Sequence, residues 1–563
     1  MPLKRVKVIL VLAVAALILS LPVFVHGPML AGHDTREHLS FGEHFAEQFW
    51  QGDLYPRWLL NMNHGLGSAS FFVYPPFPSL VYALLLPAAK IVHLNAFSLG
   101  EYLCLLASGL CAFLWMTTIA STRVSLIAAV IYMLLPYHLA IDFYRRDALS
   151  ECWALAWMPL VLFFTTQAVR KQRYALVGLA LAYALLIVSH LVSVAILSAL
   201  PLLLALTVGE RGRKVKALFT VIGGLALGTI VSAAYLVPAF ANAKYFPVSQ
   251  LDIPIDNGPN GDLLVFGWNL LTGHSGKSRF VQFVSLATVD TVLFLAFCSL
   301  VALAKGPRRR RSQTLLWLAV CPIPLFLMSG ESQWIWKAVP ALASAVQFPW
   351  RFDVVLCIAA LPLAAFVLTD VMQMPVRSRV GFLAIIVLFA ATWFGGYAGA
   401  VRRLTLERDD VGGRFTVHDG WFAAWTPRGT DLVSAIEASA GPHARFLTGQ
   451  GTATVLLWKA RRIEVQTDCA ACGPLMVNQF YYPKWEARLV PDGKPLPVAP
   501  ALPQGLLEVQ VPPGRQHVLL DMPQGLDEQI GNWLSALGMM ACGILGALGF
   551  VRNRSGPRPE SRA

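Results

Sequence analysis

The sequence has few charged residues for its length. Only 14% of its 563 residues are Asp, Glu, Lys or Arg, whereas 56% are hydrophobic. Soluble domains usually have about a quarter of their residues charged. This shortage of charge excludes an ordinary soluble globular protein, and apolar runs of about 20 residues predict a polytopic membrane protein.

Several motifs are also missing. The sequence contains no Walker loop, dinucleotide fingerprint or nucleophile elbow, so soluble nucleotide chemistry has no support. The nine cysteines are scattered, and only Cys469 and Cys472 form a close pair, which indicates neither a disulfide framework nor a zinc ribbon. The net charge of +13 comes from basic residues in short loops beside apolar runs, as the positive-inside rule expects. We therefore expect membrane lipids, and no nucleic acid, as partners.

Twelve apolar segments are long enough to be candidate transmembrane helices. They are residues 7–25, 97–119, 124–142, 150–169, 174–190, 191–208, 217–239, 283–304, 313–329, 352–372, 380–400 and 533–551. The first is predicted to be an uncleaved helix rather than a signal peptide, because no small-residue cleavage site follows it. Basic residues at both ends of the chain and in the loops 170–173, 211–216, 308–311 and 377–379 place these loops and both termini in the cytoplasm.

Residues 77–94 form a further apolar segment, which is predicted to lie on the outer membrane surface. The segment is short, it contains Pro87, and Tyr74-Pro75-Pro76 precedes it. If it crossed the bilayer, every later basic loop would lie on the wrong side. A true span, with an error elsewhere in the topology, is the alternative.

This topology places the unusual polar residues on the extracytoplasmic face. The outer parts are residues 26–96, 144–150, 240–282, 330–351 and 401–531. The last part is polar, and its alternating stretches at 453–459, 462–466 and 505–511 are typical of strands. The predicted fold is an all-α polytopic membrane protein of about 12 transmembrane helices. Residues 1–400 form the membrane domain, 401–531 a β-sandwich-like outer domain, and 532–563 the last helix and tail.

The first outer loop begins with a cluster of ionisable residues. Asp34 follows the first span, and in a helix His33 would face Glu37 while Asp34 would face His38. A carboxylate beside an imidazole at the membrane surface can act as a general base or bind a divalent cation. The alternative is a helix N-terminus that Asp34 caps, with the other charges solvated.

A second cluster lies on the same face, between the third and fourth spans. Charged residues near hydrocarbon are costly unless they pair or bind something. Arg145 and Arg146 are candidate phosphate contacts, and the spacing of Asp147 and Glu151 places both on one face of a helix. A plain ion pair between Arg146 and Glu151 is the alternative.

Three further outer residues are candidate contacts for a substrate. Arg351 can bind a phosphate through its planar fork of donors, or it can anchor its helix in the headgroup layer beside Trp350. His190 lies at the outward turn of the helical hairpin 174–208, where a structural histidine is the alternative. Lys244 lies in the loop 240–282 and is a less specific candidate.

Cys469 and Cys472 lie in the outer domain. An oxidising compartment favours a local disulfide between them. A redox-active pair is the alternative, but the surrounding sequence does not resemble a thioredoxin βαβ unit.

The order of these outer motifs resembles that of the GT-C superfamily of membrane glycosyltransferases, which use polyprenyl-phosphate-linked sugars. The shared features are an acidic residue in the first outer loop, a surface helix opened by Pro-Pro, a second acidic motif in the next outer loop and a C-terminal outer domain. The sequence is more closely similar to the bacterial YfhO-type proteins and to membrane proteins labelled as 6-pyruvoyl-tetrahydropterin synthase-related. The motifs that carry this likeness are residues 32–34, 54–58, 63–67, 72–76, 144–151, 347–352, 480–485, 492–494 and 511–518.

The resemblance implies an inverting glycosyltransferase of the bacterial cytoplasmic (inner) membrane, which moves a sugar from a polyprenyl-phosphate donor to a glycan, lipid or protein acceptor on the outer face. Its expected catalytic residues are Asp34, Asp147 and Glu151. Its expected substrate and phosphate contacts are His33, Arg57, Tyr74, Arg145, Arg146, His190, Lys244 and Arg351. A divalent cation, Mg²⁺ or Mn²⁺, would be held by Asp34, His38, Asp147 and Glu151. The acidic pair that several relatives have in the first loop is reduced here to Asp34.

A non-catalytic component that binds or transports a lipid-linked glycan, or helps to assemble the envelope, is the alternative function. A transporter is expected to show paired half-repeats with broken helices near the membrane midplane. The sequence shows no convincing internal repeat, and its charged residues lie at helix ends. These features favour the enzyme.

Overall fold

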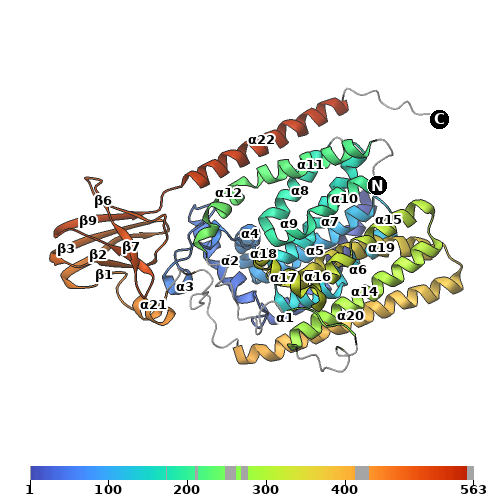
Figure 1. The fold of residues 1–563 in the computed structure, drawn as a ribbon, viewed down its shortest axis with the longest axis horizontal. Coiled ribbons are helices and arrows are strands. Elements are labelled where there is room, and N and C mark those ends of the chain that lie inside the picture. Colours follow the sequence, from blue (N-terminus) through green and yellow to red (C-terminus); the bar gives the residue numbers. More distant parts are fainter. Residues whose placement is uncertain are drawn as a thin grey trace.

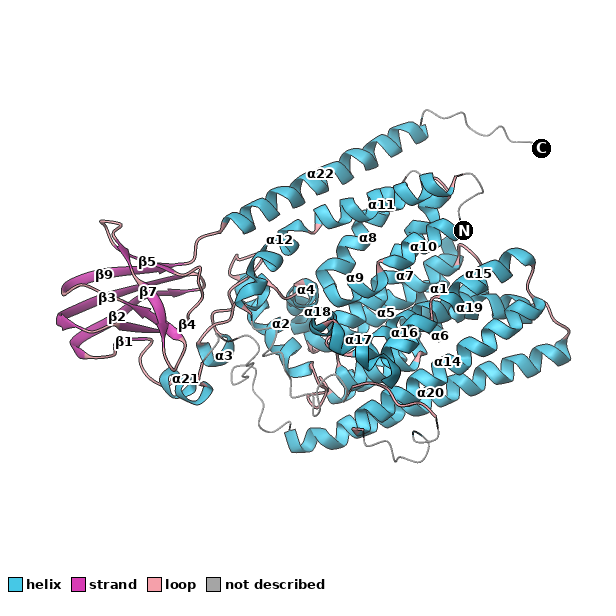
Figure 2. Ribbon diagram, in the orientation of Figure 1, coloured by secondary structure: helices cyan, strands magenta, loops and turns pink. Residues whose placement is uncertain are grey.

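The computed structural model describes residues 2–172, 174–208, 213–246, 262–267, 270, 277–411, 426 and 430–554. The chain has two parts, a helical bundle and a smaller β domain at one end of it (Figures 1 and 2). The first helix begins, and the last helix ends, at the opposite end of the bundle (Figure 1). The β domain and the chain's two described ends therefore lie at opposite ends of the molecule.

Helices account for most of the described chain. From the N-terminus they are α1 (Pro2–His26), α2 (Thr35–Trp50), α3 (Met62–Gly65), η1 (Ser70–Phe72), α4 (Phe77–Ile91), α5 (Ala96–Met116), α6 (Thr122–Leu134), η2 (Tyr137–Arg146), α7 (Leu149–Val169), α8 (Ala175–Ser189), α9 (Leu191–Leu197), α10 (Ala199–Val208), α11 (Lys214–Val231), α12 (Ala233–Asn242) and η3 (Ala243–Tyr245). They continue with α14 (Arg279–Lys305), α15 (Arg308–Ala319), α16 (Pro322–Met328), η5 (Gly330–Ser332), α17 (Gln333–Ala338), α18 (Pro340–Val346), η6 (Pro349–Phe352), α19 (Asp353–Met372), α20 (Val376–Val411), α21 (Leu432–Ser439) and α22 (Leu526–Arg554).

Eleven helical segments in the described part of the chain are long and apolar enough to cross a membrane. They correspond to all but one of the twelve predicted spans. The exception is 174–190, which forms α8, an apolar helix of 15 residues. The predicted surface segment 77–94 forms α4, also 15 residues long, which is shorter than the roughly 20 residues that a perpendicular span needs. The predicted fold class, a polytopic helical membrane protein with a C-terminal β domain, is confirmed.

Helix α2 is amphipathic and packs against α4. Its buried residues His38, Phe41, Gly42 and Phe45 recur at the three- and four-residue spacing of one helical face. Gly42 lies so close to α4 that a Cβ atom there would be 2.8 Å from Cγ of Tyr82. This packing fixes the position of α2, whose first residue follows Asp34.

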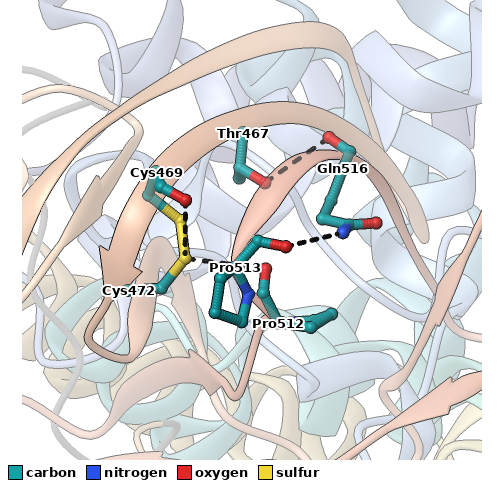
Figure 3. Close-up of a disulfide and its surroundings, with 6 residues drawn as sticks. All are labelled: Thr467, Cys469, Cys472, Pro512, Pro513 and Gln516. Atoms are coloured by element: carbon teal, nitrogen blue, oxygen red, sulfur yellow. Dashed lines mark hydrogen bonds between the residues drawn. A yellow bond between two sulfur atoms is a disulfide. The ribbon is translucent and has the colours of Figure 1, made fainter.

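The β domain consists of two antiparallel sheets. Their strand orders are β1-β4-β8-β7 and β2-β3-β9-β5-β6. The strands are β1 (Ala444–Phe446), β2 (Gly449–Lys459), β3 (Arg462–Cys472), β4 (Leu475–Phe480), β5 (Glu486–Leu489), β6 (Pro495–Leu496), β7 (Val498–Ala501), β8 (Leu506–Val509) and β9 (Gly514–Asp521). The three predicted strands are present as β2, β3 and β8. Cys469 and Cys472 form a disulfide within β3 (Figure 3).

The boundaries of the outer domain differ from the sequence prediction. Helix α20 continues past residue 400 to Val411, and its 36 residues span about 54 Å, longer than the hydrocarbon layer. Helix α22 begins at Leu526, before the expected residue 533. Both helices therefore extend beyond their apolar segments. The added residues, 401–411 of α20 and 526–532 of α22, include charged side chains, so a prediction from hydropathy alone leaves them out of the helix.

The β domain is attached to the first outer loop by an apolar core. Trp58, Leu66, Ala69 and Phe72 belong to the same buried cluster as the inner residues of both sheets. The Trp58 indole N–H also donates a 2.8 Å hydrogen bond to Gln479 Oε1 in β4. The first outer loop thus contributes to the hydrophobic core of a domain that lies about 400 residues later in the sequence.

Candidate functional site

The candidate site lies where the first outer loop meets the turn between η2 and α7. The backbone N–H of Asp34 donates a 2.8 Å hydrogen bond to the carbonyl of Arg146, and that of His33 donates a 3.4 Å bond to Arg145. A Cβ atom at position 32 would lie 3.2 Å from Cβ of Asp147, so Gly32 permits this close approach. The two predicted clusters are therefore in direct contact.

The local sequence explains the shape of this turn. Pro136 lacks an N–H group, and the regular helix α6 ends just before it; η2 then continues as a π-helix. Asp147 adopts left-handed backbone dihedrals, with φ of +54°, and ends η2 before α7 begins at Leu149. The prediction that Asp147 and Glu151 share one helical face is wrong, because this turn separates them into different elements.

Arg146 lies at the centre of the cluster. Its guanidinium group donates hydrogen bonds to Asp142 and, at 2.8 Å, to Glu151. Its Nη2 atom lies 3.8 Å from Oδ2 of Asp34, and its Cζ atom lies 4.5 Å from the ring centre of Trp350. Arg146 thus links the first-loop carboxylate to two buried carboxylates, and the alternative predicted for it, an ion pair with Glu151, is observed.

Glu151 is fully engaged by its neighbours. The Tyr137 hydroxyl donates a 2.8 Å hydrogen bond to Oε1, and Arg146 and Arg351 lie 2.8 and 3.4 Å from Oε2. Its position in the first turn of α7 adds stabilisation from the helix dipole. Glu151 is buried and serves to hold two arginines in place.

Arg351 is buried beside this pair. Its Nη1 atom donates hydrogen bonds of 3.0 Å to the carbonyl of Val346 and 2.7 Å to Oε1 of Gln347. The structure therefore places Arg351 behind Glu151, within the protein, rather than at an exposed headgroup position.

Asp34 differs from the other carboxylates of the cluster. It occupies the N-cap position of α2, but its side chain makes no capping hydrogen bond. The side chain is 37% exposed, whereas Glu151 and Asp147 are 1% and 2% exposed. Asp34 is thus an accessible carboxylate whose position is set by its backbone bond to Arg146, and not by a capping role.

Asp147 lies on the buried side of the turn. Burial is the largest cause that raises its pKa to about 7, and the neighbouring Asp34 carboxylate contributes in the same direction. Its Oδ2 atom is buried without a hydrogen-bond partner, as is Oε2 of Glu101 on α5. Asp147 therefore holds a proton more readily than an exposed aspartate does.

His38 and Tyr74 form the wall beside Asp34. Burial lowers the pKa of His38 to about 4, so its imidazole is neutral at physiological pH. The ring centres of His38 and Tyr74 are 6.1 Å apart, and the Tyr74 hydroxyl shares a 3.1 Å hydrogen bond with Ser150, next to Glu151. The surface motif before α4 is thereby connected to the second cluster.

His33 and His190 are placed differently. The exposed His33 packs its ring edge-on against Phe280, with ring centres 4.5 Å apart. His190 caps α9, because its Nδ1 atom lies 2.8 Å from Oγ of Ser193 and accepts from the Ser193 N–H. His190 has the predicted alternative structural role, and it lies near enough to interact electrostatically with Glu151.

Two predicted substrate contacts lie away from Asp34. Arg57 is buried in an ion pair, with its Nε atom 3.2 Å from Glu528, and donates a 2.6 Å bond to the carbonyl of Ala234. Lys244 lines a pocket beside the β domain. The expectation that Arg57 contacts phosphate is therefore corrected, since its donors join the first outer loop to α12 and α22.

The residues expected to hold a divalent cation do not fit one. Within the described part of the chain, no group of three or more His, Cys, Asp or Glu side chains is arranged as a metal site. The oxygens of Glu151 accept from Tyr137 and Arg146, and Asp147 is turned away into the protein. Glu151 is paired with two arginines and Asp147 is buried without an arginine partner, so the predicted set of Asp34, His38, Asp147 and Glu151 is not arranged as a ligand set among the described residues.

Three residues of the cluster were absent from the sequence prediction. Asp142 precedes Arg146 by four residues on one helix, and this spacing is itself a signal for an ion pair. Glu101 is an acidic residue within an apolar span, which is by default a functional candidate. Tyr137 has no such signal, because its bond to Glu151 depends on the π-helical turn.

Comparisons with known proteins agree with a membrane protein. Residues 71–255, less than half of the chain, match the family model described as a 6-pyruvoyl-tetrahydropterin synthase related domain, a membrane protein. The match confirms, for this segment, the resemblance stated from the sequence. No curated protein matches the chain.

The chain is also similar to solved structures. One is the arabinofuranosyltransferase AftD from Mycobacteria, with 19% identity over 69% of this chain and 27% of AftD, and a TM-score of 0.45. Another is the Archaeoglobus fulgidus oligosaccharyltransferase in the apo form, with 14% identity over 71% of this chain and 56% of that protein, and a TM-score of 0.41. The chain thus spans about a quarter of the length of AftD and just over half of the oligosaccharyltransferase.

Proposed function

We propose that the protein is an inverting membrane glycosyltransferase that takes a sugar from a polyprenyl-phosphate donor and transfers it to an acceptor on the outer face. The observation that carries the proposal is Asp34, an accessible carboxylate that is fixed beside a buried arginine. The resemblance of the sequence to membrane glycosyltransferases supplies the reaction class. The basic loops support a cytoplasmic location for both termini, and hence an extracytoplasmic site.

Asp34 is the proposed general base. It removes the proton from an acceptor hydroxyl as that oxygen forms a bond to the anomeric carbon of the donor. The bond between the anomeric carbon and the phosphate oxygen breaks, and its electron pair leaves with polyprenyl phosphate. Attack opposite the leaving group inverts the configuration at the anomeric carbon.

The arginines have different proposed roles. Arg146 and Arg351 are buried and paired with carboxylates, so they position Asp34 and add positive potential to the wall behind it. Arg145 has the most accessible side chain of the three and is the proposed contact for the leaving phosphate. The exposed His33 imidazole lies next to it along the paired backbone and can donate a second hydrogen bond.

The other two predicted catalytic carboxylates act through their neighbours. Glu151 holds Arg146 and Arg351, and is proposed as a positioning residue. Asp147 supports the turn that carries Arg146, and in its protonated form it adds no negative charge behind Asp34. A single accessible base therefore remains, which is sufficient for an inverting transfer with a phosphate leaving group.

The test uses lipid-linked material that accumulates in a deletion strain, identified by mass and then supplied to purified protein together with an envelope-glycan acceptor. We expect its conversion to polyprenyl phosphate and a lengthened acceptor, at the same rate with and without a chelator. Binding of the lipid-linked glycan without any conversion would support the non-catalytic binding or transport function instead. A rate that falls to background with chelator would contradict the assignment of a metal-free site.

A further inference from the structure

A pocket of about 270 Å³ lies between the first outer loop and the β domain. Trp58 and Ser68 contribute from the loop, Lys244 and Tyr245 from the segment after α12, and Tyr481 and Tyr482 from the segment after β4. Thr426 and, from β7, Pro500 also line it, so five separate parts of the chain meet around one cavity, which is distinct from the cluster at Asp34.

The aromatic walls of this pocket are held rigidly. The Trp58 indole donates a 2.8 Å hydrogen bond to Gln479, and the Tyr482 hydroxyl donates a 2.8 Å bond to Asn242. The ring of Tyr245 stands edge-on to that of Tyr482, with centres 5.7 Å apart. Trp58 and Tyr482 are buried, so they form a rigid backing for the exposed Tyr245 ring, and little ordering of the pocket is needed when a ligand binds.

The rim of the pocket is polar and accessible. Tyr245 is 37% exposed, and the exposed Lys244 ammonium lies 5.0 Å from its ring centre. The flat face of Tyr245 suits the C–H face of a sugar ring, while the Lys244 ammonium and the Tyr245 hydroxyl can bond to sugar hydroxyl groups or to a sugar carboxylate. The volume is just below the usual range for small-molecule sites, so it suits one or two sugar rings rather than a large ligand.

A short stretch of the first outer loop connects the pocket to the candidate site. Ser68 and Ala69 line the pocket, and Tyr74, five residues after Ala69, bonds to Ser150 beside Glu151. Five residues span at most about 18 Å. A glycan chain of a few sugars that is seated in the pocket can therefore reach toward Asp34.

We propose that this pocket binds a saccharide unit of the acceptor glycan and holds the chain while its end is extended at Asp34. The saccharide-binding site follows from the pocket alone, whereas its acceptor role rests on the proposed function. The pocket also explains the position of Lys244, which was predicted as a substrate contact but lies away from the carboxylate cluster.

The test is saccharide binding to the purified full-length protein. The probe is a size-fractionated set of envelope oligosaccharides, released by mild acid and labelled at the reducing end with a fluorescent amine. We expect Tyr245→Ala to weaken binding at least 10-fold, and Lys244→Ala to weaken it several-fold. The matched control is Trp334→Ala, which removes a 65% exposed aromatic ring from α17, outside the pocket, and leaves the affinity unchanged.

Two results would overturn the proposal: equal affinity of the Tyr245→Ala variant and the wild-type protein, or displacement of the probe by a fatty acid in a Tyr245-dependent manner. The second result would assign the pocket to an acyl chain. Binding is also measured with Asp34→Asn, where the pocket proposal expects normal affinity and the proposed function expects no transfer. Saccharide binding therefore tests the pocket, and sugar transfer tests the proposed function, so one proposal can fail while the other holds.

Discussion

At the scale of single residues, burial divides the carboxylates of the site into groups with different chemistry. Glu151 is neutralised by two arginines, Asp147 is buried and readily protonated, and Asp34 is accessible. The same functional group, a carboxyl, therefore supplies a structural anion, a readily protonated acid and a candidate base within one cluster.

The raised pKa of Asp147 predicts a pH-dependent stability. Its folded-state pKa is about 7, against 3.8 for an unperturbed carboxyl, so between these values the folded protein holds a proton that the unfolded chain releases. The stability associated with this group is fully present below pH 4 and is lost as the pH rises toward 7, by an upper limit of roughly 4 kcal/mol. Thermal unfolding at pH 5 and pH 8 should show a smaller fall for Asp147→Asn than for the wild-type protein. Identical pH dependence in the two proteins would contradict the buried, protonated state.

The residues of the site could be predicted from the sequence only in part. The predicted topology placed Asp34 and Arg146 on the same face of the membrane, because Asp34 follows the first span and Arg146 follows the third. The contact of Asp147 with Gly32 could not be predicted, since it depends on left-handed backbone dihedrals at a non-glycine residue. The position of Arg57 was also inaccessible, because its partner Glu528 lies in the last helix and periodicity carries no information about such contacts.

At the scale of elements, the position of α2 determines the position of Asp34. Hydropathy predicted the spans well, since apolar length is sufficient to define them. It could not predict the π-helical end of the third span or the extension of α20, because both depend on local backbone geometry and charged helix ends. The two short helices α2 and α4 meet through Gly42 and Tyr82, a contact between residues 40 positions apart.

The close contact between Gly42 and Tyr82 allows a test of how the packing of α2 on α4 positions Asp34. Gly42→Ala brings a methyl group to 2.8 Å from the Tyr82 ring, so the overpacking cost of about 1–3 kcal/mol should exceed the gain in helix propensity. We expect a lower unfolding temperature and slower transfer, because α2 shifts and carries Asp34 with it. The control is Gly381→Ala in α20, where a Cβ atom meets nothing within 4 Å. An equal effect of both substitutions would show that the packing of α2 on α4 is not critical.

At the scale of the whole molecule, the β domain is joined to the bundle by a buried charged network. Glu528, at the start of α22, lies 3.2 Å from Arg57 in the first outer loop and 2.9 Å from Arg461 in the turn between β2 and β3. Lys484 pairs with the adjacent Asp527 at 2.7 Å. The network lies beside the apolar core that Trp58 and Phe72 share with the sheets, so the loop, the β domain and the last helix form one unit.

Removal of the charge at Glu528 should loosen this unit. Glu528→Gln leaves Arg57 buried without a counter-charge, which costs about 3–5 kcal/mol in comparable pairs. We expect faster proteolysis of the β domain in the folded protein. Arg462→Gln is the control, because its pair with Glu464 is exposed and contributes about 0–1 kcal/mol. Equal protease resistance of the Glu528→Gln variant and the wild-type protein would show that the apolar core alone holds the domain.

The most direct measurement is the rate of sugar transfer by purified Asp34→Asn protein from the lipid-linked donor. Its matched control is Glu47→Gln, since Glu47 lies on α2, the helix that begins directly after Asp34, and its side chain has a similar exposure of 41%. We expect Asp34→Asn to lower the rate by a factor of about 10²–10⁴ at unchanged unfolding temperature, as loss of a general base does, and Glu47→Gln to retain wild-type transfer. Normal turnover by the folded Asp34→Asn protein would contradict the account.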